Sequence, residues 1–213
     1  METETTGTMT LIIVIITALV SFAAFQNREL MAKLMFNAYL VKHSNQWYRV
    51  VTHAFIHGGW MHLGINMWVL WLFGGIVEAS FDAYRGSLGV VIYAALYLGG
   101  ILFSTLPSYA RNQDNFSYNS LGASGATAAV LFSAIYFNPT MNLYIMFIPI
   151  PIPAVIFGIA YLALEWYQDK KSNDNIAHDA HFWGAAFGFV FSILMAPDRM
   201  TGFIEEITYR FMG

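Results

Sequence analysis

The sequence contains no cysteine and very little charge. The absence of cysteine excludes a disulfide framework, a thiolate metal site and a cysteine nucleophile. Only 11% of the 213 residues are charged, whereas 57% are hydrophobic. A soluble domain needs more charge to cover its surface, so this composition predicts an integral membrane protein. The net charge of −3 provides no basic surface, and we therefore expect no nucleic-acid partner.

Long apolar segments predict an all-α, multi-pass membrane protein. A helix crosses the hydrocarbon core with roughly 20 apolar residues. Six segments near that length occupy about 9–25, 60–77, 88–106, 120–138, 143–166 and 177–196. The fifth contains "PIPIP" at 149–153, which predicts a kinked or late helix start. Because no repeat or low-complexity linker interrupts the chain, we expect one domain over residues 1–213.

The connector between the first two segments, residues 26–59, has a different character. It mixes apolar residues with Arg28, Lys33, Lys42 and Arg49, which favours an amphipathic element lying in, or partly embedded in, the interface. If the N-terminus were cytoplasmic, seven basic residues would lie in outer loops and three in inner ones. The positive-inside rule alone therefore favours an N-terminus outside.

Several polar side chains interrupt the apolar segments. His62 and Asn66 are four residues apart and so share one helix face. Ser124 lies in the fourth segment, and His178 and His181 begin the sixth. Polar groups in spans are costly and usually face the bundle interior or a water-filled cavity. The simplest interpretation of His62 and Asn66 is hydrogen bonding between helices, and that of His178 is a partly solvated helix end.

Ser124 also has a simple structural interpretation. Small neighbours such as Gly122, Gly125 and Ala126 allow helices to approach closely, and a serine among them is usually part of that packing. The run "GASGA" does not match the hydrolase pattern G-x-S-x-G, because Ala126 occupies the fifth position.

The combination of these residues favours acyl-transfer chemistry instead. A serine hydroxyl needs a base to accept its proton, and His181 could serve. His62 and Asn66 could donate hydrogen bonds to the developing oxyanion. Gly184 and Gly188 follow His181 with small-xxx-small spacing, which would bring the sixth segment against the fourth.

Three runs of residues resemble the rhomboid intramembrane serine proteases. They are "HAFIHGGWMHLGINM" at 53–67, "GASG" at 122–125 and "AHDAHFWGAAFG" at 177–188. The resemblance implies a six-transmembrane-helix bundle with a partly embedded amphipathic first loop. It also implies that the serine begins a short fourth helix, below the membrane surface, in a cavity open to water.

The resemblance implies a role for each matching residue. Ser124 would be the nucleophile and His181 the general base of a dyad, with His62 and Asn66 as oxyanion donors. The remaining matches are the packing glycines Gly184 and Gly188 and the first-loop arginine Arg49. No cofactor or metal is implied. The implied partners are the lipid bilayer and transmembrane helices of substrate proteins, which would enter past the fifth span.

The chain departs from the family at the position four residues after the serine. A tyrosine on which the histidine stacks is frequent there, whereas this chain has Ala128. The resemblance therefore implies no partner that orients His181. The family orientation, with the N-terminus inside and the catalytic face outside, is preferred to the charge count. We expect a multi-pass protein, in the plasma membrane if the source is bacterial.

Two other functions remain open. A catalytically inactive rhomboid-like protein would bind transmembrane clients, although such proteins have typically lost the serine or the histidine. A metal carrier could use five of the six histidines of the chain, namely His53, His57, His62, His178 and His181. Carboxylates for a transport path are few: Asp179, with Glu78 and Glu165 near span ends. The chain has neither an H-E-x-x-H sequence nor a pair of membrane-embedded aspartates.

Overall fold

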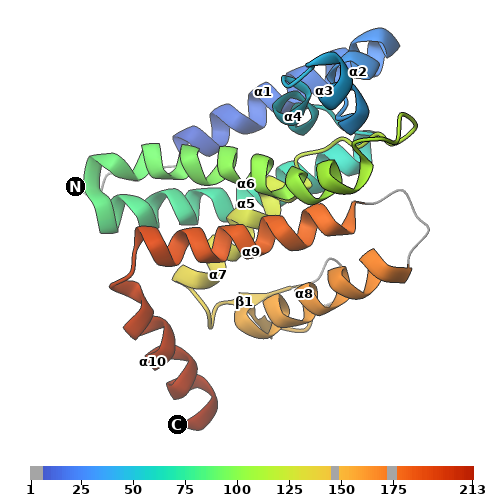
Figure 1. The fold of residues 1–213 in the computed structure, drawn as a ribbon. Coiled ribbons are helices and arrows are strands. Elements are labelled where there is room, and N and C mark those ends of the chain that lie inside the picture. Colours follow the sequence, from blue (N-terminus) through green and yellow to red (C-terminus); the bar gives the residue numbers. More distant parts are fainter. Residues whose placement is uncertain (1–6, 145–148, 172–176) are drawn as a thin grey trace.

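The fold is a bundle of helices with one two-residue-stranded hairpin (Figure 1). The computed structural model describes residues 7–144, 149–171 and 177–213. Its elements are α1 (Thr8–Gln26), α2 (Arg28–Leu34), α3 (Ala38–Ser44), α4 (Arg49–Thr52), η1 (His53–Phe55), α5 (Trp60–Arg85), η2 (Gly86–Leu88), α6 (Gly89–Asn112), α7 (Ser124–Phe137), β1 (Asn142–Leu143), β2 (Ile152–Pro153), α8 (Ala154–Lys171), α9 (His178–Met195) and α10 (Arg199–Met212).

Helices α1 and α5 to α9 fall on the six apolar segments of the sequence. Helix α8 begins only at Ala154, directly after the last proline of "PIPIP", which is the late start predicted from those prolines. Strand β2 is formed by the last two residues of "PIPIP" and pairs antiparallel with β1, with Asn142 opposite Pro153.

The length and composition of the helices identify an integral membrane protein. Among the described residues, two helical stretches are long and apolar enough to cross a membrane: α1, and the run Trp60–Asn112 that contains α5 and α6. A third is added if α9 and α10, bent by 117° at their junction, are counted as one. Helix α7 has only 14 residues, and α8 carries four charged residues in its last two turns.

Helix α7 is the centre of the bundle. Every residue from Gly125 to Phe137 is buried, as expected for a helix that is apolar on all sides. It packs against α5, α6 and α9 and, at fewer positions, against α8. In Figure 1, α9 runs between α6 and α8, with α7 behind it. Ser124 is the first residue of this central helix.

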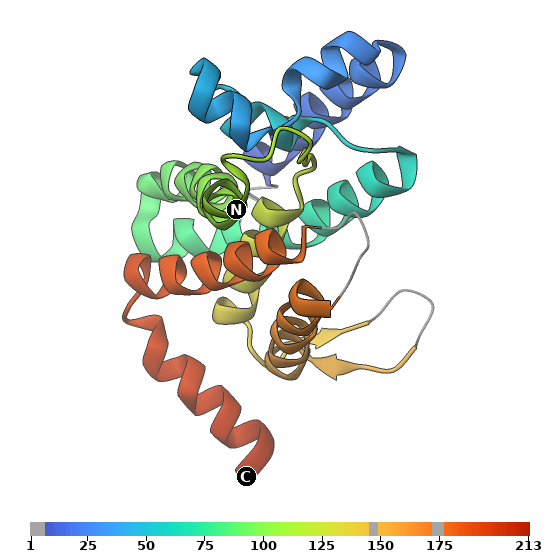
Figure 2. The same cartoon turned by 45° about the vertical axis from the view of Figure 1, so that its right-hand side comes forward.

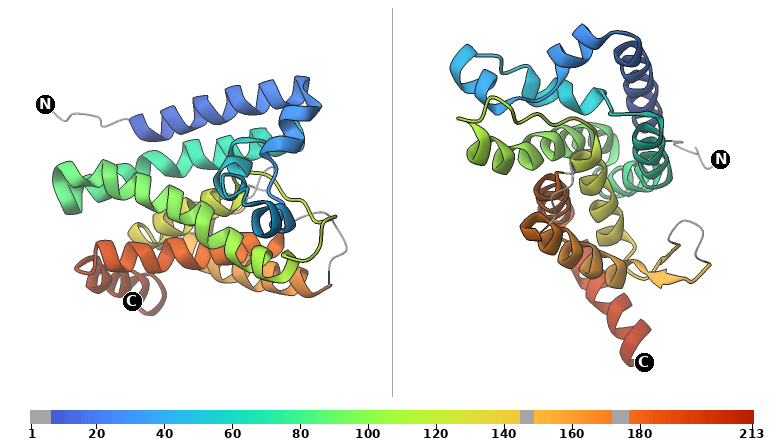
Figure 3. Two further views of the ribbon diagram at one scale, coloured as in Figure 1. Left: turned by 45° about the horizontal axis from the view of Figure 1, so that its top comes forward. Right: turned by 90° about the vertical axis from the view of Figure 1, so that its right-hand side faces the viewer.

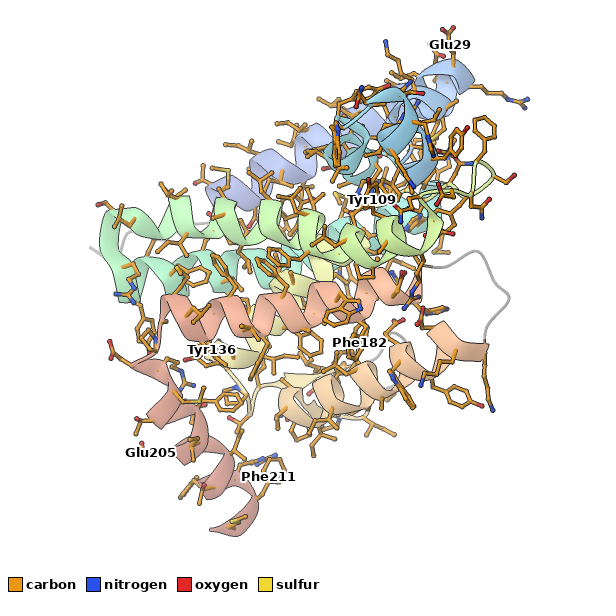
Figure 4. The ribbon with its side chains drawn as sticks, viewed as in Figure 1. Glu29, Tyr109, Tyr136, Phe182, Glu205 and Phe211 are labelled. Atoms are coloured by element: carbon orange, nitrogen blue, oxygen red, sulfur yellow. The ribbon has the colours of Figure 1, made fainter. Side chains whose placement is uncertain are left out.

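The last helix, α10, leaves the bundle at a sharp bend (Figure 2). Two contacts hold the bend against the end of α7. The hydroxyl of Tyr136 donates to the carbonyl of Ala196 at 2.7 Å, next to the α9–α10 junction (Figure 4). The buried guanidinium of Arg199 donates to the carbonyl of Phe137 at 2.8 Å. Helix α10 thus extends from a fixed point, with one apolar and one polar face.

The connector folds into the short helices α2, α3 and α4 at one end of the bundle (Figure 3). Arg49 holds it together, because its buried guanidinium donates to the carbonyls of Ala32 at 2.8 Å and Met35 at 2.7 Å. The backbones of Phe36 and Ser120 exchange two hydrogen bonds, of 2.9 and 3.1 Å. The connector therefore braces the loop that leads into α7.

The N-terminus of α1 is capped by a side chain from another helix. The carboxylate of Glu78, on α5, accepts hydrogen bonds from the amides of Met9 at 3.1 Å and Thr10 at 2.6 Å, and from the Thr10 hydroxyl. Glu78 is buried. The first amides of a helix lack acceptors within the helix and favour a negative charge. The carboxylate of Glu78 supplies the acceptors and the negative charge, and so joins α1 to α5.

We expect Glu78→Ala to lower the free energy of unfolding by roughly 2–4 kcal/mol, because it leaves buried donors without acceptors. Glu78→Gln should cost less, since its amide oxygen can still accept. Reversible unfolding in mixed micelles measures both. Exposed Glu29 on α2 provides the control, and Glu29→Ala should leave stability nearly unchanged. A Glu78→Ala protein as stable as the parent would contradict this role.

Two histidines of the connector are buried and neutral. The Nε2 of His53 lies 3.1 Å from the hydroxyl of Thr105. His57 is fully buried, with Nδ1 2.9 Å from the Ser21 hydroxyl, and its Nε2 accepts the amide N–H of Ala123 at 3.3 Å. Loss of hydration lowers the pKa of His53 to about 4 and that of His57 to about 3.

These histidines should make the protein less stable as the pH falls below neutral. Their folded-state pKa values lie below the unfolded value of about 6.5, so over this range the unfolded state binds protons that the folded state does not. The free energy of unfolding should decrease between pH 6 and 4, by up to about 1.4 kcal/mol per pH unit for each histidine. His43, whose side chain is 41% exposed, is the control. His53→Gln and His57→Gln should each flatten the pH dependence, whereas His43→Gln should not. An equal slope in all four proteins would refute the effect.

Candidate active site

A cavity of about 830 Å³ lies between α5, α7, α8 and α9. Helices α5 and α8 contribute mostly apolar side chains, while its polar lining includes the residues singled out in the sequence. The lining residues are Gly58, Met61, His62, Ile65, Asn66, Val69, Asn119, Ser120, Leu121, Ser124, Thr127, Ala128, Leu131, Phe157, Tyr161, Glu165, Ala177 and His181.

Ser124 occupies the first position of α7, and the chain reaches it through Gly122. Gly122 has a φ of +120°, which side chains rarely tolerate. A Cβ at this position would also lie 2.8 Å from Nε2 of His62. Glycine at this position permits the backbone turn and leaves room for the His62 ring over the loop before Ser124.

The environment of His62 fixes which ring nitrogen can donate. The amide N–H of Gly58 donates to Nδ1 of His62 at 3.3 Å. A neutral imidazole that accepts at Nδ1 carries its proton on Nε2. Nε2 is the nitrogen of His62 that lies beside Gly122, and Gly122 is two residues before Ser124 in the chain. His62 therefore presents an N–H donor to the loop that leads to Ser124.

Asn66 is also oriented by its neighbours. Its Nδ2 donates to the carbonyl of His62 at 2.9 Å, one turn earlier on α5. Its Oδ1 lies 3.1 Å from the hydroxyl of Thr127 on α7, which also lies 3.0 Å from the carbonyl of Ser124. With its oxygen held toward α7, the amide keeps a second N–H that no protein acceptor uses among the described residues. Thr127 was not singled out in the sequence, where it reads as one more small helical residue.

His181 is held by a carboxylate. Its Nδ1 lies 3.1 Å from Oε1 of Glu165, on α8. A carboxylate is an obligate acceptor when ionised, so Nδ1 carries the proton and Nε2 is left as the basic nitrogen. Ala128, at the family's tyrosine position, lines the same cavity and offers no ring. Glu165 thus takes over the orientation of His181.

Glu165 contacts a second histidine as well. Its Oε2 lies 2.6 Å from Nδ1 of His178, one turn before His181 on α9. His178 is only 5% exposed. The interpretation of His178 as a partly solvated helix end is therefore wrong, because the carboxylate of α8 pairs with it inside the bundle.

The approach of α9 to α7 depends on two glycines. A side chain on Gly184 would clash with the carbonyl of Gly125, and one on Gly188 with that of Ala129. His181 lies one turn before Gly184, so this contact carries it to the level of Ser124, where both line the cavity. No hydrogen bond joins Ser124 to His181 in the part of the chain that the structure describes. Catalytic hydrogen bonds are often long without substrate and shorten in the complex.

Among the described residues, the five histidines considered for metal transport do not form one group with metal-ligand spacing. His53 and His57 are engaged with Thr105 and with the Ser21 hydroxyl, respectively. Within residues 7–144, 149–171 and 177–213, one group of three side chains has metal-ligand spacing, and it consists of Glu165, His178 and His181.

The sequence of the chain is similar to those of known proteins. The Rhomboid domain family model matches residues 44–198. RHOMBOID-like protein 12, mitochondrial, from Arabidopsis thaliana is 31% identical over 154 residues, which cover 67% of this chain and 45% of that protein. Presenilin-associated rhomboid-like protein A, mitochondrial, from Danio rerio is 32% identical over 149 residues, 65% of this chain and 35% of that protein. Rhomboid protein 1, mitochondrial, from Saccharomyces cerevisiae is 29% identical over 150 residues, 67% of this chain and 40% of that protein.

The chain spans less than half the length of each of these relatives. Because the family match covers most of the sequence, the chain belongs to the rhomboid family.

Proposed function

We propose that the protein is an intramembrane serine endopeptidase that cleaves transmembrane helices. The observation that carries the proposal is that a serine, a histidine and two oriented donors line one cavity between four helices. Each of these polar groups would be costly in isolation within an apolar bundle. Together they form the constellation that acyl transfer requires.

The reaction begins when the hydroxyl oxygen of Ser124 attacks the scissile carbonyl carbon. Nε2 of His181 accepts the hydroxyl proton and later passes it to the leaving amine, which departs as the peptide bond breaks. Water then attacks the resulting ester, again with His181 as the base, and releases the acyl fragment. Glu165 stabilises the protonated imidazole and keeps its basic nitrogen available to Ser124.

Three donors would stabilise the tetrahedral oxyanion. They are Nε2–H of His62, the free N–H of Asn66 and the amide of Ser124 at the start of α7. The N-terminus of a helix leaves its first amides unpaired and favours negative charge, so α7 itself contributes. These groups are fixed before substrate arrives, and little energy is spent in reorienting them.

The substrate would enter from the membrane. We propose that α1, α5, α6, α7, α8 and α9 are six spans and that the connector is partly embedded in one leaflet. The cavity wall is apolar on both α5 and α8, through Ile65 and Val69 on one side and Phe157 on the other. A transmembrane helix passing between them, unwound near a small residue, would present its backbone to Ser124. This entry requires no cofactor and no nucleic acid.

The comparisons favour a mitochondrial membrane as the location. The relatives described above are named as mitochondrial. The plasma membrane expected from the sequence draws no support from them.

The test is labelling by a serine-directed fluorophosphonate together with cleavage of a reporter transmembrane segment. We expect the parent to be labelled and active, and Ser124→Ala to lose both. His181→Ala should reduce both by about 10²–10⁴-fold, the contribution of a general base. Ser120, a second hydroxyl of the cavity, provides the matched control, and Ser120→Ala should still be labelled.

Two outcomes would overturn the proposal. Undiminished cleavage by Ser124→Ala would exclude this nucleophile. A folded parent that binds the reporter segment without cleaving it, and that does not react with the fluorophosphonate, would indicate an inactive rhomboid-like binder of transmembrane clients.

Glu165 should act on turnover rather than on substrate binding. We expect Glu165→Gln to lower kcat by on the order of 10²-fold or more, with KM little changed, because the amide no longer fixes the tautomer or stabilises the imidazolium. Glu165→Asp should restore part of the rate. Asp169, on the same helix, pairs with Arg111 outside the cavity and is the control, so Asp169→Asn should keep kcat. Equal kcat values for parent and Glu165→Gln would show that His181 needs no carboxylate.

A further inference from the structure

Glu165, His178 and His181 form a cluster that the catalytic steps use only in part. The carboxylate of Glu165 bridges Nδ1 of both histidines, at 2.6 and 3.1 Å. The three ligand atoms all lie within 4.8 Å of one another. Glu165 and His178 are buried, whereas the His181 side chain is 18% exposed at the cavity. Proton transfer to and from Ser124 needs His181 and Glu165 but gives His178 no role.

The donor set is that of a three-ligand zinc site. Two imidazole nitrogens and one carboxylate oxygen bind Zn²⁺ at about 2.0–2.2 Å, with the fourth tetrahedral position left to water. Ligand atoms around such an ion are about 3.3 Å apart, so small side-chain rotations would convert the present spacing into a tetrahedral face. His181 and Glu165 both reach the cavity, which supplies the path of entry and the space for the fourth ligand.

We propose that these three residues form a Zn²⁺ site whose occupation switches off the protease. The inhibitory part of the inference rests on the proposed function. A neutral imidazole that binds zinc through Nδ1 must carry its single proton on Nε2. Zinc binding would therefore move the His181 proton from Nδ1 to Nε2, with no other bond made or broken in the ring. The nitrogen that should accept the Ser124 proton is then already protonated.

The same chemistry predicts which ions are effective. Imidazole nitrogens suit Zn²⁺ and Co²⁺, whereas Mg²⁺ and Ca²⁺ require oxygen ligands. Zn²⁺ should therefore inhibit and Mg²⁺ should not, at equal concentration. A chelator added after Zn²⁺ should restore activity, because no covalent change has occurred.

Direct binding can be measured without catalysis. Ser124→Ala protein, purified in micelles, is titrated with Co²⁺, whose visible absorption reports tetrahedral nitrogen and oxygen ligands. We expect one Co²⁺ per chain, displaced by Zn²⁺. Adding His178→Gln to Ser124→Ala should weaken binding by at least about tenfold, the loss found even for residues that only support a ligand. The control is His43→Gln in the same background, because His43 forms an exposed pair with Asp114 and should not matter.

Inhibition is then measured as the ratio of cleavage rates with and without Zn²⁺ for each protein. The ratio should fall steeply for the parent and for His43→Gln, and stay near one for His178→Gln. Absence of Co²⁺ binding to Ser124→Ala, or equal Zn²⁺ inhibition of parent and His178→Gln, would overturn the zinc site. If the parent binds Co²⁺ but cleaves nothing, the metal site stands and the protease proposal fails. If the parent cleaves the reporter segment but binds no Co²⁺, the protease proposal stands and the metal site fails.

Discussion

The arrangement of the cavity depends on the contact between the backbones of α7 and α9. Gly184 and Gly188 remove the side chains that would otherwise keep the two helices apart, so carbonyls of α7 lie directly against α9. In a bilayer, apolar surfaces gain little by meeting each other, and close van der Waals contact between small residues takes over. This contact sets the depth at which His181 faces the first turn of α7.

Once the helices are in place, neighbouring polar groups fix the orientation of His62, Asn66 and His181 in the cavity. An amide of the loop before α5 sets the tautomer of His62, a carboxylate on α8 sets that of His181, and Thr127 holds the amide of Asn66. The three supporting groups come from three different segments of the chain. Such a site is preorganised, because the cost of orienting its dipoles is met during folding.

The sequence predicts the helices better than the contacts between their ends. Apolar runs located α1 and α5 to α9, and prolines located the late start of α8. Glu165 was missed as a partner of His181, since the two are 16 residues apart on different helices and only packing brings them together. Ala128 indicated that the family's tyrosine is absent, but not which residue orients His181 in its place. The apolar composition of α7 also did not distinguish a helix exposed to lipid from one buried among other helices, because both environments favour the same residues.

The shortness of α7 has a consequence for the depth of the cavity. Fourteen residues rise about 21 Å, roughly 9 Å less than the hydrocarbon thickness. If the far end of α7 reaches one interface, its serine end stops well inside the opposite leaflet, where Asn119 and Ser120 then bring polar backbone to the same depth. Because α7 lies among α5, α6, α8 and α9, those groups meet the cavity between the helices instead of acyl chains, which could not solvate them. The short helix therefore leaves a polar recess inside the bundle, within the thickness of the membrane.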